Sequence, residues 1–102
     1  MKLMETMKLT ERSKQLFMDY ATDAGNWNGT PLVGGNVSGS KRDRGNLTQL
    51  KKAGLIGTVK DGTGTWLYFT SLGIRCADAL GIDLSWIEAD RYGSRTITVK
   101  EA

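Results

Sequence analysis

The residues with the clearest chemical potential form a cationic cluster between positions 41 and 60. Six basic side chains lie there against one acid, Asp43; they are Lys41, Arg42, Arg44, Lys51, Lys52 and Lys60. The segment 76–90 has the opposite balance, with four acids and no base. Clustered Lys and Arg side chains neutralise phosphates, so this distribution favours a polyanionic partner for the basic segment. The alternative is that both segments are ordinary solvated surface.

Catalytic residues are scarce by comparison. The 102 residues include no histidine and a single cysteine, Cys76. These counts remove the commonest general base, every Ser–His or Cys–His nucleophile, an intramolecular disulfide and a cysteine-based zinc site. Asp83, Glu88 and Asp90 lack the compact spacing of a calcium loop. We therefore expect no enzyme, no metal and no cofactor, and a histidine-free enzyme that uses carboxylates is the least favoured alternative.

Length and composition predict one small domain. The chain is 39% hydrophobic and 25% charged, with a net charge of +3 and a pI near 9.2. No apolar run approaches the ~20 residues of a membrane span, and the first residues, MKLMETMKLTER, make a poor signal peptide. We expect a cytoplasmic protein with a flexible lead-in over 1–9, a core over 10–81 and a C-terminal extension over 82–102.

The first predicted helix covers residues 10–24. Thr10 is a suitable N-cap, apolar residues recur along one helical face, and Gly25 is expected to end the helix in the left-handed conformation. The glycine-rich segment 26–40 follows, in which Trp27 is expected to cover the core. Leu32 and Val33 are expected to form a very short strand.

A second helix over 41–53 is predicted from Ser40 as N-cap and Gly54 as terminator. Two β-prone runs then flank residues 61–64, a strong hairpin signal. Thr70 caps a third helix over 71–80. Residues 84–87 suggest a short helix or turn, and residues 96–99 a terminal strand.

The helix over 41–53 has two unlike faces. Leu47 and Leu50 lie about 60° apart and mark the buried stripe. The opposite face is predicted to carry Lys41, Arg42, Gly45, Thr48, Gln49 and Lys52, with Arg44 and Lys51 on one flank and Asn46 on the other. Side chains of these types donate to phosphates and base edges, which suits a helix that reads DNA. An ordinary solvent-exposed helix face is the competing interpretation.

The run RGNLTQLKKAGLIGTVKDGTGTWLYFTSLG resembles the recognition helix, β-hairpin wing and following helix of winged helix-turn-helix proteins. The matching positions are Leu47, Leu50, Gly54, Leu55, Ile56, Thr70 and Gly73. The resemblance implies an α+β winged helix: three main helices, a two-stranded β-hairpin wing and a short C-terminal extension. The segment 31–40 departs from the family, because it is too short and glycine-rich for the first helix of the motif. We expect a turn or loop there, in which Asn36, Ser38 and Ser40 could donate to a phosphate.

These features together predict a protein that binds double-stranded DNA, with or without sequence preference. It would be a small transcriptional regulator or accessory protein of a phage or plasmid type. The predicted contact residues are Lys41, Arg42, Arg44, Asn46, Thr48, Gln49, Lys52 and Lys60. A homodimer is expected if binding is specific, and Trp86, Ile87 and the terminal strand are the candidates for its contact. The alternative is a winged-helix interaction module or inhibitor that binds a protein partner and no DNA.

Overall fold

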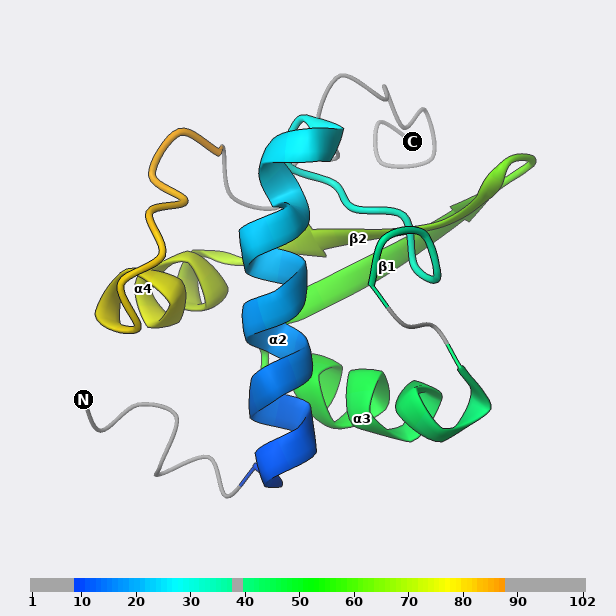
Figure 1. Cartoon of the computed structure of the whole chain (residues 1–102), viewed down its shortest axis with the longest axis horizontal. Helices are drawn as coiled ribbons and strands as arrows, with labels where there is room; N and C mark the ends of the chain where they lie inside the picture. The colour runs from blue at the N-terminus through cyan, green and yellow to red at the C-terminus, as the bar shows by residue number, and fades with distance from the viewer. Residues whose placement is uncertain (1–8, 38–39, 88–102) are drawn as a thin grey trace.

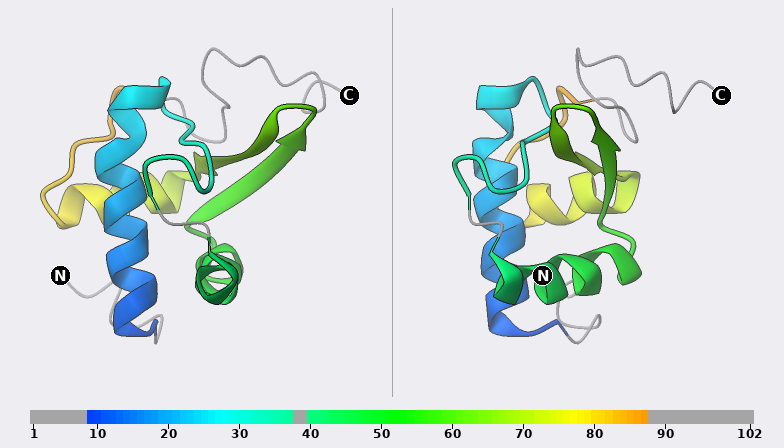
Figure 2. Two further views of the ribbon diagram at one scale, coloured as in Figure 1. Left: turned by 45° about the vertical axis from the view of Figure 1, so that its right-hand side comes forward. Right: turned by 90° about the vertical axis from the view of Figure 1, so that its right-hand side faces the viewer.

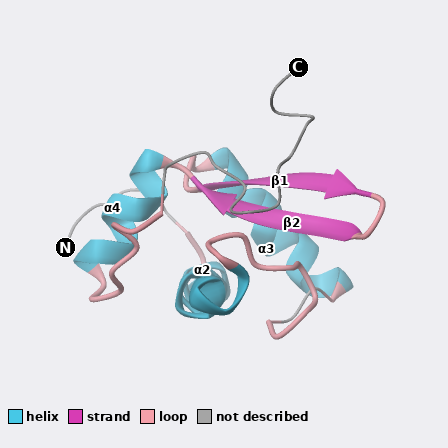
Figure 3. Ribbon diagram, turned by 90° about the horizontal axis from the view of Figure 1, so that it is seen from above, coloured by secondary structure: helices cyan, strands magenta, loops and turns pink. Residues whose placement is uncertain are grey.

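The computed structural model of the chain describes residues 9–37 and 40–87, apart from the side chain of Arg42. Within these residues the structure is α+β, with three α-helices and one antiparallel β-hairpin. The elements follow one another as α2 (Glu11–Asp23), η1 (Ala24–Trp27), α3 (Lys41–Lys52), β1 (Ile56–Asp61), β2 (Gly64–Phe69) and α4 (Ser71–Ala79). Figure 1 shows α2 upright, with α3 crossing beside its lower end and α4 on the other side from the hairpin tip. Viewed from above in Figure 3, the hairpin and α4 lie on one side of α2.

The helix α2 begins as predicted and ends differently. The Thr10 side chain accepts a hydrogen bond from the Ser13 N–H and caps the first turn. The prediction that Gly25 ends the helix is wrong, because the chain continues through η1 and turns left-handed only at Asn28, at φ 55°. The Asp23 carboxylate holds this extra turn by accepting hydrogen bonds from the Asn26 amide and the Trp27 indole, each at 2.7 Å.

The helix α3 has the predicted caps and the predicted buried stripe. The Ser40 hydroxyl accepts from the Asp43 N–H, and Gly54 at φ 82° lets the Leu55 N–H reach back to the Leu50 carbonyl. Leu47 and Leu50 are buried in the core. The core itself joins side chains from α2, α3, the hairpin and α4, and its fully buried members include Tyr20, Phe17, Phe69, Leu16, Leu50, Leu55, Leu67 and Leu84.

The hairpin forms where the sequence predicts it. Its register runs from the Ile56–Phe69 pair at the base to the Asp61–Gly64 pair beside the tip. The Asp61 carboxylate shapes the tip by accepting from the N–H groups of Thr63, at 2.8 Å, and Gly64, at 3.1 Å. A side chain that accepts neighbouring backbone N–H groups stabilises a tight turn, so the tip has a defined conformation.

The segment 31–37 replaces a helix with bridges and a turn. Instead of a short strand, Leu32 forms a single bridge to Trp66 of β2, and Val33 bridges Val37. The Tyr20 hydroxyl fastens this segment to α2, since it donates to the Val37 carbonyl at 3.3 Å and accepts from the Gly34 N–H at 3.2 Å. Burial raises the pKa of this hydroxyl, which keeps its proton available. Within the described residues, the expectation of a turn or loop is confirmed.

The helix α4 packs against the base of the hairpin. Thr70 caps it as predicted, and its hydroxyl also donates to the Gly54 carbonyl. A Cβ atom at Gly73 would overlap the Leu55 carbonyl oxygen, so only glycine allows this approach. Beyond α4, a turn closes with the Ile87 N–H donating to the Leu84 carbonyl.

Other sequence predictions concern residues without a described structure. Residues 1–8 of the lead-in expected over 1–9, and the strand expected at 96–99, lie outside the described residues. Leu9, the last residue of that lead-in, is buried in the core. Among the residues that are described, no helix is long and apolar enough to cross a membrane.

Candidate nucleic-acid interface

One flank of α3 is fastened to α2 by a buried carboxylate. Asp43 is 3% exposed, and its two carboxylate oxygens accept from the Arg12 guanidinium at 2.9 and 2.7 Å. The Asn46 amide also donates to Asp43, at 2.9 Å. The acid within the basic segment is therefore turned inward and paired with Arg12 of α2. The described cations on the outer side of α3 form no ion pair with an acid among the described residues.

Two predicted contact residues lie on this same flank. The Asn46 amide oxygen accepts from the Ser13 hydroxyl at 3.0 Å. The Gln49 amide oxygen accepts from the Thr10 N–H at 2.9 Å. Both side chains are half-buried. The structure thus places Asn46 and Gln49 in the contact between the two helices.

The opposite flank of α3 borders a groove beneath the hairpin. Its volume is about 590 Å³, and the described residues that line it are Leu32, Val33, Arg44, Leu47, Thr48, Lys51, Thr58, Lys60, Thr63, Gly64 and Thr65. The structure therefore gathers three predicted contact residues, Arg44, Thr48 and Lys60, at one surface feature, which we call the groove. Figure 2 shows the hairpin rising away from α3 toward its tip.

Lys51 also lines the groove, although it is absent from the predicted contact set. Its ammonium group donates to the Thr58 hydroxyl of β1 at 3.3 Å, which links α3 to the hairpin. The helical period places Lys51 beside Arg44, and this proximity could have added Lys51 to the predicted contact residues. The sequence does not show which flank of the helix the hairpin covers.

Strand alternation explains how the hairpin contributes to the groove. Side chains at alternate positions share a face, so Thr58 and Lys60 lie on the same face of β1 as the buried Ile56. The partner of Lys60 across the sheet is Thr65, which also lines the groove. The face that builds the core at the base of the hairpin thus becomes a polar, cationic wall toward the tip. Applying the two-residue period to 56–61 and to 64–69 could have identified Thr58 and Thr65.

The remaining predicted cations lie on the outer side of α3. Lys41 and Lys52 are exposed, as are Gly45 and Thr48, and we call these four residues the ridge. A Cβ atom at Gly45 would meet nothing within 4 Å, so the helix backbone is open to a ligand there. The side chain of Arg42 lies outside the described part of the structure.

Asn36, Ser38 and Ser40, which precede α3 in the chain, were expected to donate to a phosphate. The Asn36 amide donates to Asp23 at 3.0 Å, and Ser40 caps α3. Burial alone would raise the pKa of Asp23, but hydrogen bonds from Asn26, Asn36 and Trp27 outweigh it and lower that pKa. Ser38 is outside the described residues. In the structure, the Asn36 side chain joins the loop to Asp23 at the end of α2.

Charge around the groove is unevenly distributed. Among the described residues the ion pairs are Arg12–Asp43 and Lys14–Glu11, and neither involves a cation of the groove or ridge. Hydrogen bonds from the Thr63 hydroxyl and N–H lower the pKa of Asp61 to about 2. This ionised carboxylate belongs to the other face of β1 from Lys60, because the two residues are adjacent in the strand.

Metal ligands and the cysteine are the remaining candidates for chemistry in the described residues. No group of three or more His, Cys, Asp or Glu side chains is placed to hold a metal ion there, and Cys76 is buried. Comparisons of the chain with protein-family models, curated proteins and solved structures gave no match.

Proposed function

We propose that the chain binds double-stranded DNA with α3, and that the hairpin serves as the wing of a compact winged helix. The observation that carries this proposal is the inward position of Asp43, whose charge is taken up by Arg12. The described outer side of α3 then presents Lys41 and Lys52 on the ridge, with Arg44 toward the hairpin. These cations form no ion pair among the described residues, and unpaired Lys and Arg side chains on a helix are suited to phosphates and base edges.

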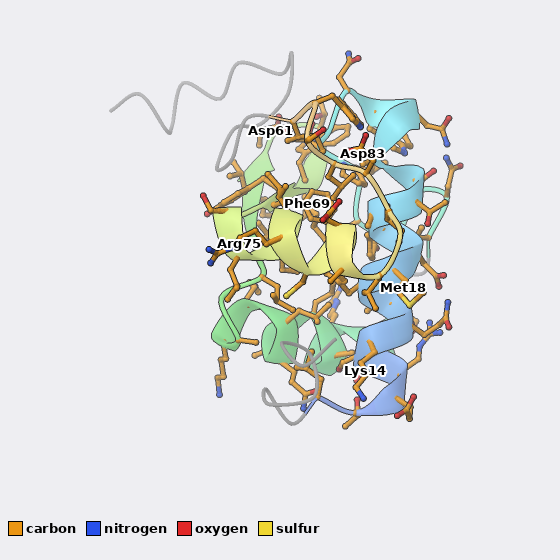
Figure 4. The ribbon with its side chains drawn as sticks, turned by 90° about the vertical axis from the view of Figure 1, so that its left-hand side faces the viewer. Lys14, Met18, Asp61, Phe69, Arg75 and Asp83 are labelled. Carbon is orange, nitrogen blue, oxygen red and sulfur yellow. The ribbon has the colours of Figure 1, made fainter. Side chains whose placement is uncertain are left out.

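Charge reversal on the ridge tests the proposal. We expect the native chain to bind a fluorescently labelled random-sequence duplex at low salt, measured by anisotropy, and to lose affinity as salt rises. Lys41→Glu with Lys52→Glu should weaken binding by roughly tenfold or more at low salt. Arg75→Glu is the control for a charge reversal away from α3, because Arg75 is an exposed residue of α4 (Figure 4) and is not among the residues that line the groove.

Two outcomes would contradict DNA binding by α3. One is the absence of any binding by the native chain at low salt. The other is an affinity that the double reversal leaves unchanged while circular dichroism shows the variant folded. In the first case capture of a protein partner would become the leading function.

A second proposal concerns self-association. Trp86 is 52% exposed, and among the described residues it is the one large hydrophobic side chain that is exposed. We propose that it contributes to a homodimer contact, which would supply the second DNA-binding unit that a specific site commonly requires. Sedimentation equilibrium should detect a concentration-dependent dimer that Trp86→Ser weakens. A native chain that stays monomeric at high concentration would exclude the dimer without bearing on DNA binding.

A further inference from the structure

We propose that the open edge of β1 binds an extended acidic peptide, which adds to the hairpin as a further strand. The site consists of the outward backbone groups of Thr58 and Lys60, with the positive charges of Lys51 and Lys60 beside them. It gives the hairpin a protein partner of its own and does not depend on DNA binding by α3.

One edge of the two-stranded sheet is covered by the segment that precedes α3. The Thr65 carbonyl accepts from the Val33 N–H at 2.8 Å, and the Leu67 N–H donates to the Pro31 carbonyl at 2.9 Å. The backbone groups of these two β2 residues therefore point away from β1. In Figure 3, β2 lies toward α2 and β1 lies on its far side. The edge of β1 is the one that remains.

The backbone of β1 points outward at Thr58 and Lys60. Along an antiparallel strand, successive residues direct their N–H and C=O groups to opposite sides. Trp66 and its register partner Val59 consequently bond to each other between the strands, and the neighbours of Val59 face away from β2. Their four N–H and C=O groups have no backbone partner among the described residues. Such an unpaired row is a template for a further strand.

The charge at this edge favours an acidic partner. The Lys51 ammonium donates to the Thr58 hydroxyl at 3.3 Å, so it lies at the edge, and Lys60 is an exposed residue of the edge itself. Neither lysine forms an ion pair within the described part of the chain. A second copy of β1 would bring the same lysines against these, and like charges oppose edge-to-edge pairing. A strand that carries Asp or Glu brings the complementary charge.

The two faces of β1 favour different side chains in the bound strand. On the face opposite to the groove, Val59 lies near the half-buried Tyr68, whose ring covers Gly57 so closely that a Cβ atom there would overlap it. The Asp61 carboxylate belongs to the same face and would repel an acid. A partner side chain on this face should be apolar, and those on the face of Lys60 should be acidic. The ligand is therefore a strand in which acidic and apolar residues alternate.

Hydrogen exchange followed by NMR tests whether the edge is occupied. The probe is a synthetic peptide of alternating Glu and Val, blocked at both ends and added to the full chain at low salt. The N–H groups of Thr58 and Lys60 should exchange about tenfold more slowly when about nine-tenths of the chain is bound. The Val59 N–H, paired within the hairpin, should be protected with and without the peptide. A peptide of alternating Lys and Val is the matched control and should give no protection.

A proline at the edge tests for backbone pairing. Thr58→Pro removes an outward N–H and leaves the ladder to β2 intact, so it should weaken peptide binding by about tenfold. Thr58→Val keeps the N–H and is the matched control, with an affinity expected within about threefold of the native value. Native affinity in a folded Thr58→Pro variant would overturn the proposal.

Methylated peptides repeat this test on the native protein, in case the proline variant does not fold. A strand directs alternate N–H groups to opposite sides, so only one set of the peptide's amides can donate to β1. N-methylation of either the glutamates or the valines should therefore abolish binding, whereas methylation of the other set should preserve it. Equal affinities of the two methylated peptides would overturn strand addition.

Other outcomes would also overturn the proposal. One is the absence of peptide binding at low salt, and another is tighter binding of the peptide of Lys and Val. Protection of the Thr58 and Lys60 N–H groups without peptide would show that another part of the chain occupies the edge, or a second copy if it rises with protein concentration. The absence of DNA binding would leave the proposal standing, because none of these measurements involves DNA.

Discussion

The two flanks of α3 differ in how their polar side chains are used. On the flank toward α2, Asp43, Asn46 and Gln49 bond to Arg12, Ser13 and Thr10, so the polar groups hold two helices together. On the flank toward the hairpin, Arg44 and Lys51 line a groove in which their charges meet no carboxylate among the described residues. One helix thus divides its polar residues between folding and a surface available to a ligand. Substitutions on the two flanks should accordingly have different consequences.

The largest expected effect on stability comes from the α2 flank. Asp43→Ala removes a charged acceptor with three hydrogen bonds and should lower the free energy of unfolding by about 3 kcal/mol, measured by urea denaturation. Arg44→Ala, one position along, should change it by less than about 0.5 kcal/mol and should weaken DNA binding instead. Equal losses of stability in the two variants would remove the distinction between the flanks.

Smaller losses are expected at the two amides that were predicted to contact DNA. Asn46→Ala and Gln49→Ala each remove hydrogen bonds to α2 and should cost about 1 kcal/mol of stability. Their affinity for DNA, compared at a temperature where both variants are folded, should match that of the native chain. If either variant kept native stability and bound DNA more weakly, the residue would be a DNA contact and this prediction would be wrong.

A change of opposite sign is expected on the ridge. Gly45→Ala replaces a mid-helix glycine where a Cβ atom has open space, so it should stabilise the protein by up to about 1 kcal/mol in thermal unfolding. If α3 approaches DNA closely there, the added methyl group should weaken binding by a similar amount, about fivefold. Greater stability with unchanged affinity would show that this part of the ridge is not in close contact with DNA.

The least effect is expected at the tip and depends on pH. The pKa of Asp61 is about 2 in the folded chain, below its usual value of 3.8. Its ionised form therefore stabilises the fold above about pH 4, and this stabilisation is lost as pH falls toward 2. The Asp61→Asn variant should lose less thermal stability than the native chain between pH 5 and pH 2.5. Parallel losses would show that the carboxylate makes no such contribution.

Local signals predicted most of the fold. Thr10, Ser40 and Thr70 begin helices because a hydroxyl that accepts a backbone N–H is a property of a few adjacent residues. The hairpin followed from strand propensity and a short polar turn. Gly25 was wrongly predicted to end the helix. A hydrogen bond from the Trp27 indole to the Asp23 carboxylate, which forms only in the folded turn, holds the additional turn η1.

The candidate site was predictable only in part. The helical period separated Leu47 and Leu50 from the cations correctly, since that separation depends on α3 alone. It could not show that Asn46 and Gln49 bond to α2, or that Lys51 lies beside the hairpin. Those positions depend on how other elements pack against α3. A polar residue on a helix has the same appearance in the sequence whether its side chain contacts a neighbouring element or solvent.

The close approach at Gly73 has a consequence for the kinetics of binding. Thr70 bonds to the Gly54 carbonyl and Gly73 packs on that of Leu55, so the base of the hairpin is fixed between α3 and α4. The width of the groove is then set when the chain folds. We therefore expect a polyanion to enter without a closing movement of the backbone at the base of the hairpin, so the cost of ordering is that of the side chains that line the groove. Association at such a preformed cationic groove is governed by diffusion and electrostatic steering, and its rate constant falls as salt rises.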